Sequence, residues 1–368
     1  MTPLFAVVAA LAKIAFVLGV VVGAIVPLLT WLERRQSAMM QDRIGPNRAD
    51  ITLFGRRFRF WGLLHPIADA IKMMRKEDFV PAGAHRGLFT IAPVFAMAAP
   101  IIVFAVLPFG PTLCWGALWA IDPDVASCGP AVRLQIAHLD AGLLFVFAIS
   151  SLSVYGYTLA GWASYNKWAL LGGLRASAQM ISYEVTMGMA VVGALLVYGT
   201  IEPLAMVEAQ RGGLLEWGIV RQPLGFVLFF VAALAETKRA PFDMPEGESE
   251  IIGYFVEYGG MRFGMFMAGE FIEVVGAAAM IVTVFLGGHY LPFGFDDALR
   301  AGLPHLGYVV VGVGVWIGKV MTLCILQLAV RWTLPRFRYD QLMGLGWKGL
   351  LPASLANVAL TAVWNAWR

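Results

Sequence analysis

The sequence predicts an all-α integral membrane protein with about eight transmembrane helices. Three observations support this fold class. Apolar and aromatic residues make up 59% of the chain, charged residues only 14%, and the mean hydropathy is +0.73. A water-soluble domain would carry about 25% charged residues. The apolar residues are gathered into long runs, and Lys and Arg are concentrated in every second loop between these runs. Together these features exclude an ordinary soluble enzyme.

The apolar runs approach or exceed the roughly 20 helical residues that a bilayer core requires. The candidate spans are residues 4–32, 87–108, 139–163, 176–199, 222–239, 263–287, 306–330 and 349–367. The fifth is the weakest, because only residues 222–235 are uncharged and a full span must include Glu236. The sixth begins with Glu270 and Glu273, which are three residues apart and so share one helix face. Two spans are therefore expected to bring carboxylates into the membrane zone.

The distribution of cations predicts the orientation of these spans through the positive-inside bias. Of the 27 Lys and Arg residues, 20 fall in loops 33–86, 164–175, 236–262 and 331–348. The alternate loops and the C-terminus hold five, and Lys13 and Lys319 lie within spans. This split places both termini on the periplasmic side. Lys319, near the middle of the seventh span, is a candidate counter-ion for one of the intramembrane acids.

The first cytoplasmic loop contains a helical pattern of its own. In residues 61–78 the apolar side chains recur at helical spacing, and most charged side chains fall on other faces. This predicts an amphipathic helix in the membrane interface, with cations placed for lipid phosphates. A helix packed beneath a partner protein is the alternative. No internal repeat or flexible linker interrupts the sequence, so residues 1–368 are expected to form a single transmembrane domain.

The segment most informative about chemistry is residues 235–258. Its carboxylates are Glu236, Asp243, Glu246, Glu248, Glu250 and Glu257. Pro241 and Pro245 prevent a regular helix, and irregular backbone at membrane depth persists only inside protein or along a water-filled cavity. Carboxylates crowded in this way should titrate as a coupled set, as a proton relay requires. The alternative is a solvated acidic loop. Glu184 and Glu270, which lie within spans, argue against that alternative.

Several familiar kinds of site are missing from the sequence. The histidines lie near span ends or in loops, and the cysteines have no metal-binding or iron–sulfur spacing. There is no dinucleotide fingerprint and no P-loop. No redox centre and no metal site are therefore expected in this chain. Cys114 and Cys128 share the loop of residues 112–132 and could form a disulfide in an oxidising compartment, although two free thiols are equally compatible.

Several long runs, in order along nearly the whole chain, resemble the quinone-chamber membrane subunit of the proton-pumping NADH:quinone oxidoreductase, respiratory complex I. The clearest runs are QDRIGPNR at 41–48, GLLHPIADAIKMMRKED at 62–78, AETKRAPFDMPEGESE at 235–250 and PRFRYDQ at 335–341. The resemblance implies a subunit that forms the membrane part of the quinone chamber. It also implies that the subunit couples quinone reduction to proton translocation through carboxylates.

The resemblance also implies roles for individual residues. Chamber-lining arginines would be Arg34, Arg43, Arg175 and Arg239. The acidic loop beside the chamber would contain Asp243, Glu246, Glu248, Glu250 and Glu257. The proton path toward antiporter-like subunits would begin with Glu184, Glu236 and Glu270. One position departs from the pattern: Ser151 stands where some bacterial members carry a glutamate.

The implied partners are the hydrophilic quinone-site subunits, the small and antiporter-like membrane subunits, quinone (ubiquinone or menaquinone) and membrane lipid, with no nucleic acid. Iron–sulfur clusters and FMN would reside in partner subunits, with no cofactor bound by this chain and no catalytic activity of the isolated chain. The bacterial inner membrane is the expected location. Two alternatives remain: the homologous subunit of a membrane-bound hydrogenase or coenzyme-linked dehydrogenase, and a free-standing secondary transporter. A transporter would favour two related halves, which the sequence does not show.

Overall fold

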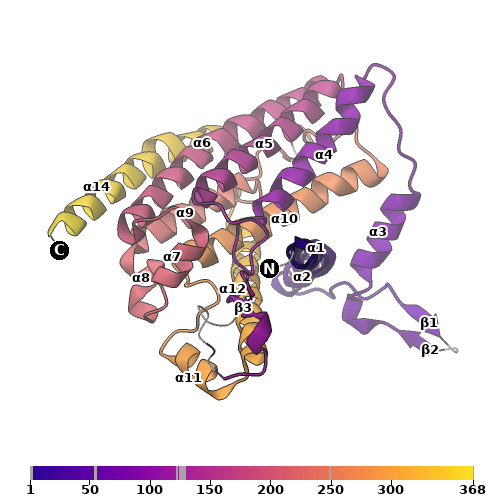
Figure 1. The fold of residues 1–368 in the computed structure, drawn as a ribbon. Coiled ribbons are helices and arrows are strands. Elements are labelled where there is room, and N and C mark those ends of the chain that lie inside the picture. The colour runs from indigo at the N-terminus through magenta and orange to yellow at the C-terminus, as the bar shows by residue number, and fades with distance from the viewer. Residues whose placement is uncertain (1–2, 54–55, 122, 124–129, 248–249, 368) are drawn as a thin grey trace.

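The computed structural model describes residues 3–53, 56–121, 123, 130–247 and 250–367. These residues form a helical bundle, which confirms the all-α class (Figure 1). The strands within the described ranges make two short antiparallel pairs. They are β1 (Ile51–Leu53) with β2 (Arg56–Phe58), and β3 (Leu113–Cys114) with β4 (Ala131–Val132).

Six helices in the described part of the chain are long and apolar enough to cross a membrane. The first is continuous from Pro3 to Met40 and comprises α1 (Pro3–Phe16), a π-helical stretch (Val17–Ile25) and α2 (Val26–Met40). The others are α4 (Arg86–Val103), α5 (Gly142–Ala163), α6 (Lys167–Tyr198), α10 (Gly260–Phe285) and α12 (His305–Thr333). The prediction of a multi-pass membrane protein is therefore confirmed.

The fifth and eighth predicted spans are shorter helices. α9 covers Pro223–Glu236, 14 residues, and α14 covers Leu351–Trp367, 17 residues. At about 1.5 Å per residue, α9 extends about 21 Å, less than the roughly 30 Å of a hydrocarbon core. α14 continues from α13 (Tyr339–Gly344) through a π-helical stretch (Leu345–Leu350). The count of eight spans is not confirmed and stays a prediction.

The predicted amphipathic segment forms α3 (His65–Arg75), which starts later than residue 61 because the backbone turns sharply just before it. Trp61 and Gly62 both have positive φ, and a Cβ on Gly62 would lie 1.8 Å from the carbonyl oxygen of Pro46. Only glycine fits there. α3 lies at the edge of the fold (Figure 1), and its apolar side chains Ile67 and Met74 are exposed.

The remaining helices are single turns or short segments in the connections. They are the 3₁₀ turns Phe60–Gly62, Trp115–Ala117 and Leu214–Glu216, and the helices α7 (Pro203–Ala209), α8 (Gly218–Arg221) and α11 (Phe295–Gly302). Cys114, in β3, takes part in a disulfide bond, whereas Cys324 is a buried free thiol. Cys128, the partner considered from the sequence, lies outside the described residues.

The bundle is packed closely around α4. α4 contacts α5 and α10, α5 contacts α6, and α6 contacts α9 and α14 (Figure 1). Gly156 of α5 and Gly269 of α10 both face Ala96 of α4: a Cβ on Gly156 would lie 2.6 Å from the Ala96 nitrogen, and one on Gly269 would lie 2.8 Å from the Ala96 oxygen. Small residues at such crossings allow helix backbones to approach in membranes.

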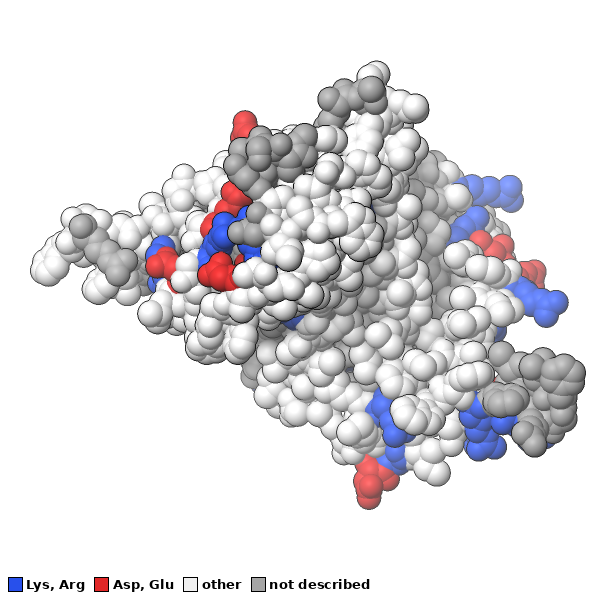
Figure 2. Space-filling view, turned by 60° about the horizontal axis from the view of Figure 1, so that its bottom comes forward, with Lys and Arg blue, Asp and Glu red and all other residues white. Residues whose placement is uncertain are grey.

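The outer surface is largely uncharged. Figure 2 shows a face on which the charged side chains gather in a few patches and most of the area belongs to other residues. On α1, Leu4 and Leu11 are exposed, and on α14, Leu360 and Val363 are exposed. Apolar side chains facing outward on long apolar helices are expected where lipid or partner helices cover them.

Candidate functional site

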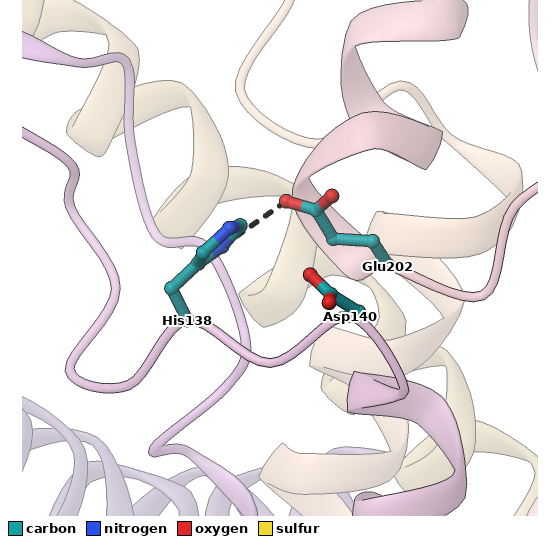
Figure 3. Close-up of side chains that lie close together, drawn as sticks. All are labelled: His138, Asp140 and Glu202. Carbon is teal, nitrogen blue, oxygen red and sulfur yellow. Dashed lines mark ion pairs between the residues drawn. The ribbon is translucent and has the colours of Figure 1, made fainter.

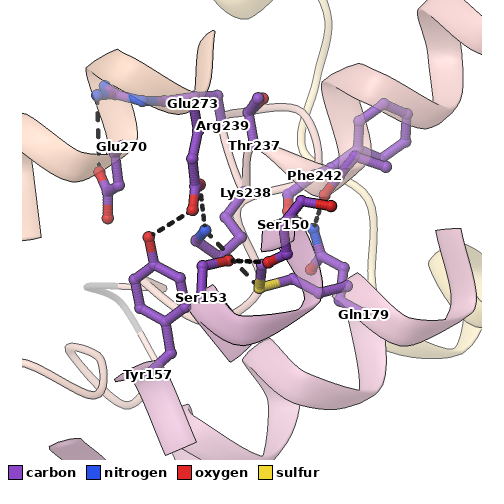
Figure 4. Close-up of polar contacts among 12 residues, drawn as sticks. Ser150, Ser153, Tyr157, Gln179, Thr237, Lys238, Arg239, Phe242, Glu270 and Glu273 are labelled. Atoms are coloured by element: carbon purple, nitrogen blue, oxygen red, sulfur yellow. Dashed lines mark hydrogen bonds and ion pairs between the residues drawn. The ribbon is translucent and has the colours of Figure 1, made fainter. Parts of the chain in front are cut away.

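Two groups of polar side chains stand out within this helical framework. One, at the start of α5, contains His138, Asp140 and Glu202 (Figure 3). The other surrounds the loop between α9 and α10, residues 237–259, and draws on several helices (Figure 4). The second group contains many of the predicted carboxylates and is the candidate functional site.

The loop of residues 237–259 has no regular helix in its described part, as its prolines predict. Buried Gln179 of α6 holds the start of the loop. Its amide nitrogen donates to the carbonyl oxygens of Ala235 and Phe242, each at 2.6 Å. Arg336 donates to the carbonyl oxygen of Asp243 at 2.7 Å. The irregular backbone is therefore fixed by side chains from α6 and from the segment after α12.

Arg239 lies between two acids from different helices. Its Nη1 is 3.4 Å from Glu33 of α2, and its Nη2 is 3.6 Å from Glu270 of α10 (Figure 4). Glu33 also pairs with Arg331 of α12. The side chains of Arg239 and Glu270 are only 10% and 1% exposed, so these charges compensate one another in a low-dielectric interior.

Glu270 also meets two groups from the loop. The hydroxyl of Tyr254 donates to it at 2.6 Å, and the carboxyl of Glu246 lies within hydrogen-bonding reach. Burial, and then the charge of Glu270, raise the pKa of Glu246 well above its ordinary value. Burial also raises the pKa of Asp243, against the opposing effect of Arg336 3.7 Å away.

A second branch of the site is built on a fully buried lysine. Lys238 Nζ is 2.7 Å from Glu273 Oε2, and the hydroxyl of Tyr157 donates to Glu273 Oε1 at 2.9 Å (Figure 4). The ammonium also lies 3.8 Å from the centre of the Tyr157 ring. Glu273 is thus held by one charge and one hydroxyl.

A small internal cavity adjoins Glu273. Its volume is about 50 Å³, and its lining includes Glu236, Thr237, Ser150 and Ser153. One water requires about 10–15 Å³ of such volume, so roughly three would fit. Ser151, the residue that departs from the family pattern, follows Ser150 and donates its hydroxyl to Glu184. The two intramembrane acids at this end of the site, Glu184 and Glu236, therefore have polar neighbours.

Other predicted residues lie nearer the surface. Arg175 Nη1 is 2.7 Å from Glu250 Oε2, and this hydrogen bond lowers the pKa of Glu250. Asn166 donates to Glu257 at 2.7 Å. Glu248 lies outside the described residues.

The four predicted chamber arginines do not meet in one place. Arg34 pairs with Asp69 of α3, Arg43 donates to Ser37 at 3.2 Å, and Arg175 pairs with Glu250. Of the four, Arg239 reaches the buried cluster. The prediction that placed all four along one chamber wall stays a prediction.

The expectation for Lys319 was wrong. Its ammonium donates to the carbonyl oxygens of Leu286, Gly288 and Tyr290 and lies 4.2 Å from the centre of the Trp217 ring. These carbonyls end α10 and begin the next connection, so Lys319 caps a helix and does not serve as counter-ion to Glu184, Glu270 or Glu273.

Sequence reasoning missed several members of the cluster, namely Glu33, Tyr157, Lys238, Tyr254 and Arg331. The cations among them lie at span ends, where they match the ordinary excess of cytoplasmic charge. The one available signal was an acid, Glu33, at the end of the first apolar run.

The chain resembles known proteins over nearly its whole length. The family described as NADH dehydrogenase matches residues 12–362. The second of the NADH-quinone oxidoreductase H subunits of Syntrophobacter fumaroxidans is 41% identical over 97% of this chain and 96% of its own length. The first of the NADH-quinone oxidoreductase H subunits of Geobacter metallireducens is 43% identical over 95% of this chain and 94% of its own. NADH-quinone oxidoreductase subunit 8 of Rhodothermus marinus is 42% identical over 91% of each.

Proposed function

Because this chain belongs to the H-subunit family of NADH-quinone oxidoreductases, and is thus a membrane subunit of respiratory complex I, we propose that its buried carboxylates couple quinone reduction to proton translocation. The chain is a multi-pass membrane protein whose partners include the other subunits of the complex. We further propose that it forms the membrane part of the quinone chamber.

One observation above all supports the coupling role: the carboxyls of Glu246 and Glu270 are in hydrogen-bonding reach of each other beside Arg239. If both were ionised, Glu246 Oε1 and Glu270 Oε2 would have no hydrogen-bond donor among the described residues. A proton between the two carboxyls supplies one. Since Arg239 stabilises charge on Glu270, the proton is held on Glu246, ready for release when nearby charge changes.

A quinone that accepts electrons develops negative charge and demands protons. Negative charge near Arg239 would weaken its hold on Glu33 and Glu270, and protons would redistribute among the coupled acids. The cavity at Glu273 and Glu236 then offers a route deeper into the bundle. Arg34, Arg43 and Arg175 would guide the quinone headgroup nearer the surface, and α3 would rest on lipid.

The electron-transfer groups belong to partners in this proposal. Iron–sulfur clusters and FMN would sit in other subunits, quinone would be the substrate, and the isolated chain would have no activity of its own. The location is the bacterial inner membrane with both termini in the periplasm. The split of Lys and Arg between alternate loops supports that orientation, and so does the disulfide at Cys114, since disulfides persist in oxidising compartments.

The proposal is tested by replacing Glu246 with Gln in the assembled enzyme. Quinone reductase and proton-pumping rates should fall about 100-fold, the low end of what a positioned proton-transfer group contributes. Electron transfer from NADH to artificial acceptors should be preserved, because it bypasses the quinone site.

The matched control is Glu208→Gln, which removes an exposed carboxylate on α7 and should leave all three rates unchanged. Asp243→Asn extends the test to the second loop carboxylate. Full quinone-linked pumping in both Glu246→Gln and Asp243→Asn would contradict the proposed role of this loop.

A further inference from the structure

The cluster at the start of α5 brings together donors that are far apart in the sequence. His138 and Asp140 lie in the segment that leads into α5, and Glu202 immediately precedes α7 (Figure 3). One ligand atom from each residue lies within 4.8 Å of the other two. Because 62 residues separate Asp140 from Glu202, no spacing in the sequence predicts this group.

The contacts of His138 cannot all be satisfied by its own ring. Its Nδ1 is 3.1 Å from Glu202 Oε1 and 3.0 Å from the amide nitrogen of Gln135. If Nδ1 accepts a hydrogen bond from Gln135, its lone pair also faces a carboxylate. If Nδ1 carries a proton and donates to Glu202, it faces the N–H of Gln135. In either tautomer, one close contact joins groups of the same polarity.

Gln135 provides an independent indication. The residue is 3% exposed, and its Oε1 has no hydrogen-bond partner among the described residues. Its backbone carbonyl is held by Lys13 Nζ at 2.7 Å, so the residue is anchored beside the cluster. The oxygen and nitrogen of a glutamine amide are interchangeable by a half-turn. That turn would place Oε1 about where Nε2 lies now, close to His138 Nδ1.

A divalent cation resolves both problems. We propose that His138, Asp140 and Glu202, with Gln135 Oε1 as a fourth donor, bind one Zn²⁺ ion. Imidazole nitrogen with carboxylate oxygen is a donor set that zinc takes, whereas calcium and magnesium favour oxygen alone. Ligands at about 2.1 Å in a tetrahedral site lie about 3.4 Å apart, close to the spacings of 3.0 and 3.1 Å around Nδ1. The two carboxylates neutralise the ion.

The ion would join three parts of the bundle. It would tie the segment before α5 to the start of α7, and through Gln135 it would reach Lys13 of α1. The site lies at the opposite end of α5 from Tyr157, so it is separate from the carboxylate cluster around Glu273.

Zinc content of the purified complex tests the proposal. Wild type, His138→Gln and Glu202→Gln complexes are stripped with a chelator, equilibrated with Zn²⁺ and measured by elemental mass spectrometry. Each variant should hold one equivalent of zinc less than wild type, with affinity at this site at least about tenfold weaker. Glu208→Gln, an equivalent change in α7, should hold as much zinc as wild type. Equal zinc in all four complexes would overturn the proposal.

A second measurement uses only the wild-type complex and is independent of variant assembly. Hydrogen exchange is compared in the stripped complex with and without added Zn²⁺. Zinc should slow exchange in residues 134–141 and 199–203, and leave residues 250–259 unaffected. Unchanged exchange in the first two segments would count equally against the site.

Discussion

Glu246 is the residue whose protonation the structure constrains most. Its carboxyl is buried and faces a second acid, Glu270, which pairs with Arg239. The arrangement resembles two carboxylates that share one proton because both cannot be ionised at such proximity. A single added negative charge nearby is enough to change where that proton lies.

The raised pKa of Glu246 leads to a spectroscopic prediction. A carboxyl whose pKa is raised by folding stays protonated above the ordinary value and loses its proton only as the pH rises through the folded value. Infrared spectra of the complex at neutral pH should therefore contain a buried protonated carboxyl signal that disappears at alkaline pH. The signal should be absent from Glu246→Gln and retained in Glu208→Gln. An unchanged signal in Glu246→Gln would assign the proton to another acid.

At the scale of single residues, the sequence predicted the acids better than the bases. Crowded carboxylates beside two prolines were recognisable, and Glu246 and Glu270 do lie together. Lys238 and Lys319 were not distinguishable by type, yet the first pairs with Glu273 and the second caps α10. Which partner a buried cation meets depends on helix packing, and this information is not local.

At the scale of elements, the Lys238–Glu273 pair fixes the loop after α9 to α10. Lys238→Met should leave Glu273 buried without its counter-ion, at a cost of about 3–5 kcal/mol, and reduce the yield of assembled complex on native gels. The double change Lys238→Met with Glu273→Gln should recover assembly but not pumping, because it removes the lone charge together with the acid.

A surface ion pair provides the control for that experiment. Arg221 pairs with Glu216, and both side chains are partly exposed. Arg221→Gln should change stability by less than about 1 kcal/mol and leave assembly intact. If Lys238→Met assembled as well as Arg221→Gln, the buried pair would have no structural role.

The contact of α5 and α10 with α4 gives a second prediction at this scale. Gly156→Ala should destabilise the bundle by about 1–3 kcal/mol, because the new methyl group meets the backbone of Ala96 and the helices must separate. Gly188→Ala in α6, where a Cβ meets nothing within 4 Å, should be neutral or stabilising. Thermal midpoints of the two purified complexes measure the difference, and equal midpoints would contradict it.

The elements themselves were predictable where hydrophobicity is long and uninterrupted, as in α12. They were less predictable where a local backbone conformation decides the boundary. The amphipathic helix starts at His65, because Trp61 and Gly62 turn the chain with positive φ. α9 ends at Glu236, just before a loop that Gln179 fixes from another helix. Neither boundary follows from composition alone.

At the scale of the whole molecule, orientation remains a prediction that a fusion can test. Alkaline phosphatase joined after Trp367 should be active, and green fluorescent protein at the same position should be dark, because only the first folds in the periplasm. Fusions within loop 164–175 should behave in the opposite way. The reverse pattern would contradict the orientation inferred from the Lys and Arg distribution.

The short length of α9 has an electrical consequence. Its start lies next to the partly exposed Arg221–Glu216 pair, and about 21 Å of helix ends at Glu236 inside a layer about 30 Å thick. On the proposed orientation, a hydrated loop brings the cytoplasmic potential down to this depth, so the membrane voltage falls over a shorter distance along α9. A proton that passes Glu236 then experiences most of the roughly 2.3 kcal/mol that 100 mV provides per charge. Turnover at this site is therefore expected to slow as the membrane potential rises.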